Sequence, residues 1–186
     1  MLRRRCNRCE PRSPELVAPE FAFERILEVL VRHGVRFVVV GAVAAIAQGS
    51  PLPTEDVDIT PARDQDNLER LATALVELKA TLRVENHLGG VPFPFDAATL
   101  ERNEIWTLTT PDGDLDIVFV PAGTSGYDDL RRSAIVVDFG SSTVAMASLA
   151  DVIRSKQAAG RPKDLGQLPA LRQTLEIVRR REGRHS

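Results

Sequence analysis

Two aspartates separated by one residue, Asp56 and Asp58, are the side chains in this sequence best suited to hold a metal ion. They alternate with the apolar residues Val57 and Ile59, which is typical of a strand with one buried face. Residues two apart in a strand share a face, so both carboxylates are expected to point the same way. Such close like charges repel, and Mg²⁺ bound by carboxylates and substrate phosphates would relieve the repulsion. A lone Asp-x-Asp is more often a solvated strand end, so the flanking sequence must decide.

A short buried strand and a small-residue helix precede this pair. The apolar run Phe37–Val40 predicts a buried strand that stops at Gly41. The following residues 42–48 are mostly small and favour a helix. Small residues at a helix start let a phosphate approach the backbone N–H groups. We therefore name Gly41, Ala42 and the spacer residue Ser50 as candidate nucleotide contacts.

A third acidic residue interrupts a segment that should be buried. The runs Ile105–Thr110 and 115–120 are rich in β-forming residues and are separated by an Asp-Gly turn, which predicts a hairpin. Asp116 lies inside the second run, where a charge is rare unless it is paired or bound to metal. A strand-end aspartate facing solvent is the alternative, and Asp114 on the same face is the second candidate for this role.

A lysine near the C-terminus lies on an apolar helical stripe. A helix is expected over Leu149–Ala159, with Ser148 as its N-cap and Gly160 at its end. Lys156 follows Val152 by four residues and therefore lies on the same face. A lysine on a buried stripe needs an acidic partner, unless its side chain extends to the surface.

Together these segments resemble the nucleotidyltransferase fold of DNA polymerase β relatives. The sequence is most similar to the branch that holds the bacterial AbiEii and MenT toxins. The matching pattern is a strand, a Gly-small pair, a short helix, a Gly, and then Thr-x-Asp-x-Asp before a hydrophobic residue. The family usually has Gly-Gly or Gly-Ser where this chain has Gly41-Ala42. The resemblance implies an α+β fold, with a mixed twisted sheet flanked by helices and followed by C-terminal helices.

The resemblance also implies roles for individual residues. Three carboxylates would hold Mg²⁺: Asp56, Asp58 and Asp116. Lys156 would bind the nucleotide phosphates. In the family pattern a basic residue precedes an Asp shortly after this lysine, and Lys163-Asp164 matches it, so Lys163 is a further nucleotide contact and Asp164 completes the catalytic set.

The reaction implied is nucleotidyl transfer, in which an acceptor hydroxyl attacks the α-phosphate of an NTP. Similarity to MenT toxins implies a tRNA 3′ end as acceptor, blocked against aminoacylation by added pyrimidine nucleotides, and a cognate antitoxin protein as partner. Thr54 matches a Ser or Thr that the antitoxin kinase phosphorylates in some relatives; a local hydrogen bond at the strand start is the alternative. AMP transfer to a protein or small-molecule hydroxyl, and a non-catalytic NTP-binding module, stay open.

Composition sets further limits. The 186 residues carry 24 Lys and Arg against 26 Asp and Glu, so no global basic field attracts nucleic acid. No apolar run approaches the roughly 18 residues of a membrane span, and no signal peptide is visible, so we expect a cytoplasmic protein without a membrane partner. Residues 1–19, which include the lone pair Cys6 and Cys9, are expected to be a disordered tail. Residues 20–147 would form the core, and 148–182 a helical segment that completes the site.

The remaining segments are expected to frame these residues. Helices are predicted at 21–33, 65–80, 97–103 and 165–182, and strands at 81–84, 134–139 and 143–146. Residues 85–96 and 123–129 are expected to be loops, with Phe93 and Phe95 as buried anchors or, alternatively, as stacking partners of a base. Pro169 is expected near the first turn of the last helix.

Overall fold

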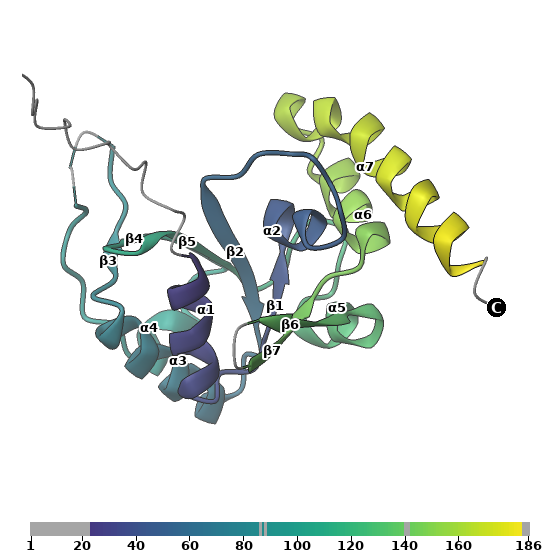
Figure 1. Ribbon diagram of the computed structural model, residues 1–186. Coiled ribbons are helices and arrows are strands. Elements are labelled where there is room, and N and C mark those ends of the chain that lie inside the picture. The colour runs from purple at the N-terminus through teal and green to yellow at the C-terminus, as the bar shows by residue number, and fades with distance from the viewer. Residues whose placement is uncertain (1–22, 86, 88, 140–141, 184–186) are drawn as a thin grey trace, which may run out of the picture.

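The computed structural model describes residues 23–85, 87, 89–139 and 142–183. Residues 1–19 and the two cysteines therefore lie outside the described residues. A mixed sheet in the order β3-β4-β5-β2-β1-β7-β6 forms the centre of the molecule (Figure 1). Its strands are β1 (Phe37–Val40), β2 (Asp56–Pro61), β3 (Thr81–Leu82), β4 (Ile105–Thr110), β5 (Gly113–Val118), β6 (Ile135–Phe139) and β7 (Ser142–Met146). The helices are α1 (Phe23–Arg32), α2 (Gly41–Ile46), α3 (Gln65–Glu77), α4 (Ala97–Glu101), α5 (Tyr127–Ser133), α6 (Leu149–Ala159) and α7 (Pro162–Glu182).

The central strands mix both directions. β2 runs antiparallel to β1 but parallel to β5, and β1 runs parallel to β7. The β4–β5 pair is the antiparallel hairpin that the Asp-Gly turn predicts, and β6 pairs with β7 in the antiparallel direction as well. The predicted α+β architecture with a mixed sheet and C-terminal helices is confirmed.

The helices form two groups around the sheet. In Figure 1, α1, α3 and α4 lie together near β3, β4 and β5, whereas α2, α6 and α7 lie together beyond β1 and β2. The inward stripe of α1 is fully buried at Ile26, Leu27 and Leu30. Val57 and Ile59 of β2 are buried too, so the opposite face of this strand is the one that carries its aspartates.

Residues 93–95 pack against the sheet through aromatic side chains. The Phe93 and Phe95 ring centroids lie 5.5 Å and 6.1 Å from that of Trp106, and Phe95 is buried. Phe95 therefore acts as a buried anchor rather than as a stacking partner of a base, and the half-buried Phe93 packs against the same ring cluster.

Two expectations about the helices were wrong. The predicted loop 123–129 ends early, because α5 begins at Tyr127, with acidic residues in its first turn and basic ones in its last, which suits the helix dipole. α7 begins at Pro162, and Pro169 lies inside the helix rather than near its first turn. Proline is favoured at a helix start, and packing of α7 against α6 keeps the helix continuous through the second proline. Within the described ranges, no helix has the length and apolar character needed to cross a membrane.

Candidate functional site

Four aspartates are aligned on one face of two neighbouring strands. Strands β2 and β5 run parallel, with Asp56 opposite Asp114 and Asp58 opposite Asp116. Residues paired across adjacent strands project from the same side of a sheet. The alternate residues of β5, Leu115 and Ile117, are fully buried on the other side, like those of β2. The sheet register thus gathers the acidic side chains that the strand pattern placed on one face.

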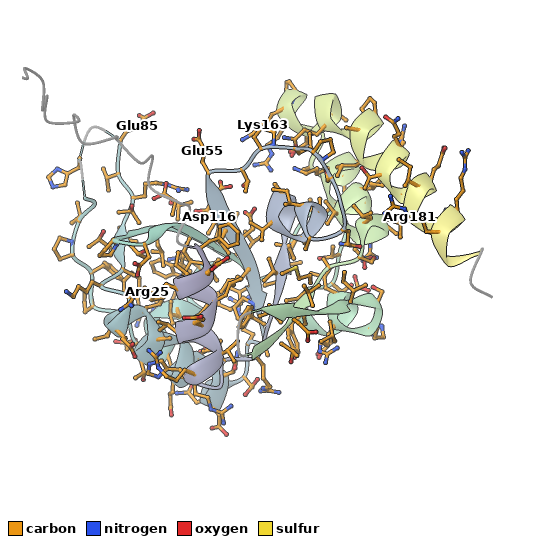
Figure 2. The ribbon with its side chains drawn as sticks, viewed as in Figure 1. Arg25, Glu55, Glu85, Asp116, Lys163 and Arg181 are labelled. Carbon is orange, nitrogen blue, oxygen red and sulfur yellow. The ribbon has the colours of Figure 1, made fainter. Side chains whose placement is uncertain are left out.

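A cavity of about 510 Å³ lies over this face. Its size suits a small organic ligand. Five residues predicted for the site line it: Gly41, Asp58, Asp116, Lys156 and Asp164. The cavity also has an apolar wall built from Val118, Val120, Leu130 and Val152. Figure 2 shows Asp116 inside the molecule beside β2, while Lys163 lies at the outer start of α7.

Other predicted site residues lie outside the lining of this cavity. Ala42 is half-buried in α2, Ser50 is buried, and Lys163 is exposed. Asp56 is half-buried on β2, two residues before Asp58, which lines the cavity. The Thr54 hydroxyl donates to the Asp56 carboxylate, with Oγ1 and Oδ1 3.0 Å apart. The local hydrogen bond named as the alternative interpretation of Thr54 is therefore present.

The carboxyl group of Asp58 is strongly perturbed. Burial, reinforced by the charges of Asp56 and Asp116, raises its pKa from 3.8 to about 7 against the opposing effect of Lys156 and Arg161. Burial also raises the pKa of Asp116, with Asp56 and Asp114 adding to the effect. Both shifts have the same origin: burial first, and then the negative charges of the neighbouring aspartates, which outweigh the opposing effect of Lys156 and Arg161 on Asp58 and of Arg83 on Asp116.

This donor set fits a divalent cation by its chemistry. Crowded carboxylate oxygens with raised pKa values are the environment that Mg²⁺ relieves, and oxygen is the ligand it prefers. Among the described residues, no group of three or more His, Cys, Asp or Glu side chains is already arranged around one metal position. Asp116 instead forms an ion pair with a basic side chain of the protein. This basic residue was not predicted from the sequence.

The cation is Arg83. Its guanidinium nitrogens lie 2.6 Å from Asp114 Oδ2 and 2.6 Å from Asp116 Oδ1. Arg83 follows β3, and its backbone N–H donates to the carbonyl of Thr107, the residue paired with Asp116. Strand alternation places Arg83 on the same face as Thr81. Only the register of β3 on β4, and of β4 on β5, shows that Arg83 contacts the aspartates.

Gly41 is required by the position of Asp58. It has a φ of +65°, and a Cβ atom built on it would overlap the Asp58 carboxylate. An L side chain is strained at that φ even without the overlap. The strand–glycine–helix signal therefore marks a close approach, here between the first residue of α2 and a carboxylate of β2.

The opposite side of the cavity carries a complete ionic cluster. Lys156 Nζ lies 3.0 Å from Asp164 Oδ1, and Arg161 Nε lies 2.5 Å from Oδ2. The Asp164 side chain is only 3% exposed. Burial alone would raise the pKa of Asp164, but the hydrogen bonds from Arg161 and Lys156 lower it. Gly160 ends α6 with a left-handed φ of +64°, and this turn brings the start of α7 back to Lys156. Asp164 is the acidic partner that the position of Lys156 requires.

Comparisons with known proteins identify the fold. No protein-family model and no curated protein matches the sequence. Among solved structures, the chain is similar to the lincosamide antibiotic adenylyltransferase LnuA bound to lincomycin, with a TM-score of 0.56 and 14% identity over 83% of this chain and 97% of that one. It is also similar to the antibiotic-resistance factor ANT(2'')-Ia, with a TM-score of 0.52 and 14% identity over 88% and 90% of the two chains.

A third similar structure is an antigenic nucleotidyltransferase-like protein from Paracoccidioides brasiliensis, with a TM-score of 0.50 and 17% identity over 86% of this chain and 77% of that one. At these identities the likeness concerns the fold. The chain has the nucleotidyltransferase fold, as the motif resemblance implies.

Proposed function

We propose that this protein is a Mg²⁺-dependent nucleotidyltransferase that moves NMP from an NTP to a hydroxyl group. One observation carries the proposal: parallel pairing of β2 and β5 places Asp58 opposite Asp116, and both line one cavity with Lys156. Asp56, Asp58 and Asp116 would hold the metal. When bound, Mg²⁺ supplies neutralisation of the triphosphate and activation of the attacking hydroxyl.

The chain's own residues position the reactants. Lys156 faces the cavity across from the carboxylates and contributes a fixed positive charge for the phosphates. Asp164 holds that lysine in place, and Gly41 leaves room beside Asp58. The acceptor oxygen attacks the α-phosphorus, the bond to the bridging oxygen breaks, and pyrophosphate leaves while the hydroxyl proton passes to a neighbouring base.

For the acceptor we propose a tRNA 3′ end, modified by a cytoplasmic toxin that a cognate antitoxin controls. The Thr-x-Asp-x-Asp resemblance to MenT toxins supports this choice. The exposed arginines 179–181 at the end of α7 offer charge for an RNA backbone (Figure 2). A phosphate on Thr54 would add about −1.5 to −2 charge beside Asp56 and oppose NTP binding. The exposed Lys163 would add a weaker contact to the nucleotide.

AMP transfer to the hydroxyl of a small molecule is the second candidate. It is favoured by the apolar cavity wall, which offers an ordinary organic molecule a surface that phosphates would not use. The likeness in fold to LnuA, an antibiotic adenylyltransferase, points the same way.

Labelled transfer assays test these candidates directly. Each of the four NTPs, labelled at the α-phosphate, would be incubated with the protein, Mg²⁺ and either total tRNA or a panel of small hydroxyl compounds. We expect Asp58→Asn to lose transfer by roughly a thousand-fold or more, because a metal ligand and its charge are removed. Asp66→Asn, an exposed change on α3, is the matched control.

The outcomes separate the candidates. Label on tRNA together with growth arrest on expression supports the toxin, whereas label on a small compound alone supports the second candidate. NTP binding without transfer to any acceptor would contradict both and leave a non-catalytic binding module.

A further inference from the structure

We propose that Arg83 is a positioning residue that substitutes for the metal in the free protein and so makes metal binding depend on bound nucleotide. This inference rests on the proposed function, because it concerns the same carboxylates. It assigns to Arg83 a role that no sequence motif indicated.

The contacts of Arg83 place its positive charge beside a carboxylate oxygen that would bind the metal ion. The guanidinium bridges Asp114 and Asp116 with two short ion pairs, each 2.6 Å long. The Asp116 side chain is 17% exposed, and one of the two oxygens of this carboxylate is already occupied by Arg83. A divalent ion and a guanidinium cannot share that oxygen, because both positive charges would meet at one position.

The backbone of Arg83 is fixed while its side chain can move. The Arg83 N–H donates to the Thr107 carbonyl, and the adjacent bridge between Leu82 and Val91 ties this segment to the loop that follows. Gly90 packs against Leu82 with no room for a Cβ atom. The Arg83 side chain, by contrast, is 33% exposed. The long side chain can therefore leave Asp116 without unfolding the strand, at the cost of its two ion pairs.

Charge balance explains why nucleotide would release it. Four aspartates crowd one sheet face, and Arg83 is the cation in direct ionic contact with two of them. Lys156 already pairs with Asp164 across the cavity. A triphosphate brings negative charge that can receive the guanidinium, which frees the Asp116 oxygen for the metal. Metal and nucleotide would then strengthen each other's binding, and linkage requires the effect to be reciprocal.

Metal binding measured without turnover tests this role. Mn²⁺ would be titrated into the protein by calorimetry, alone and with a non-hydrolysable NTP analogue present. For Arg83→Gln we expect Mn²⁺ alone to bind about five-fold tighter or more at low salt, since the competing charge is gone. The ratio of the two affinities, with and without analogue, should fall by a similar factor.

Matched variants keep the result interpretable. Arg32→Gln removes the same charge at an exposed pair with Glu77 on α1 and α3, and should leave Mn²⁺ affinity unchanged. Arg83→Lys keeps the charge but loses the two-pronged contact, so its Mn²⁺ affinity should lie between those of the wild type and Arg83→Gln. Thermal melting of each variant shows whether it is folded.

An Arg83→Gln variant that is folded and binds Mn²⁺ no tighter than the wild type would overturn the inference. A purely structural role predicts that outcome, because the freed Asp116 would become disordered and bind metal less well. If the wild type still transfers nucleotide, only the role of Arg83 fails. Loss of the proposed function itself would appear separately, as absence of transfer by the wild type.

Discussion

The sheet side of the cavity crowds like charges, whereas the helix side pairs opposite ones. On β2 and β5, Asp58 and Asp116 both have raised pKa values, because burial and neighbouring aspartates disfavour their ionised forms. On α6 and α7, Asp164 has a lowered pKa because Arg161 and Lys156 donate to it. Both sides contain aspartates, yet the surroundings shift the pKa values of their carboxyl groups in opposite directions.

On the helix side the carboxylate is fully paired with protein cations, whereas on the sheet side the carboxylates are not. The helix cluster pairs its one carboxylate with two cations and should be as well ordered without ligand as with it. The sheet cluster gains stability when a cation arrives, and Arg83 supplies only part of that charge. Removing a carboxylate should therefore lower the free energy of unfolding on the helix side and raise it on the sheet side when no metal is bound.

The largest expected effect is on the helix side. Asp164→Asn should lower the free energy of unfolding by about 3 kcal/mol, because it leaves the half-buried Lys156 without its acidic partner. Urea denaturation at neutral pH measures the change. Asp112→Asn removes the half-buried partner of the exposed Arg25 and should cost under about 1 kcal/mol. Equal losses in the two variants would mean that the helix cluster is no more stabilising than a surface pair.

Gly41 begins α2, which contacts both β2 on the sheet side and α6 on the helix side. Gly41→Ala should lower the free energy of unfolding by about 2 kcal/mol. Roughly 1 kcal/mol comes from the left-handed backbone, and the rest from the overlap with the Asp58 carboxylate. Denaturation of Gly41→Ala, Asp58→Ala and the double variant measures the coupling between the two positions. Strict additivity would show that the alanine is accommodated without displacing Asp58.

Much of this arrangement could be predicted from the sequence, because it follows from local periodicity. Alternation around Asp56 and Asp58 gives their common face, and an interrupted apolar run singles out Asp116. The helical spacing of Lys156 implies an acidic partner, although Asp164 itself was named from the family pattern. These inferences need only the repeat of a strand or a helix.

What could not be predicted depends on how separate elements align. Arg83 meets Asp114 and Asp116 only through the register of β3 on β4 and of β4 on β5, and no local pattern encodes that register. The short helix α5 was missed because a glycine-rich segment leads into it and its polar composition resembles a loop. Acidic residues followed by basic ones, the sign of a helix dipole, were the available signal.

On the sheet side, removing a charge should stabilise the protein. The pKa of Asp58 is about 7 in the folded protein, against 3.8 for an unperturbed aspartate side chain. The folded state therefore holds this proton more tightly than the unfolded chain does. Stability should therefore fall as the pH rises from about 4 to about 7. Without metal at about pH 8, Asp58→Asn should gain about 1–2 kcal/mol, a value reduced for the partial solvent access of the site.

Mg²⁺ sharpens the same test. Added at about pH 8 together with a non-hydrolysable NTP analogue, it should raise the melting temperature of the wild type above that with analogue alone and leave that of Asp58→Asn unchanged, because binding to the folded state alone stabilises it. Asp66→Asn, exposed on α3, should respond like the wild type. A destabilised Asp58→Asn variant in metal-free buffer would show that the carboxylate is already compensated, and the contrast between the two sides would disappear.

The smallest effect concerns two lysines on the helix side. Lys156 is 15% exposed and lines the cavity, whereas Lys163 is exposed at the start of α7. We expect Lys163→Gln to raise the KM for NTP by less than about three-fold at 0.15 M salt, since an exposed charge is largely screened. Lys156→Gln should raise it by roughly ten-fold or more, because the charge of this largely buried side chain is screened less. Steady-state kinetics at two salt concentrations separates the cases: the small Lys163 effect should vanish at high salt, while the Lys156 effect should persist. Equal and salt-sensitive effects would mean that the triphosphate lies at the mouth of the cavity, along α7, rather than between the carboxylates and Lys156.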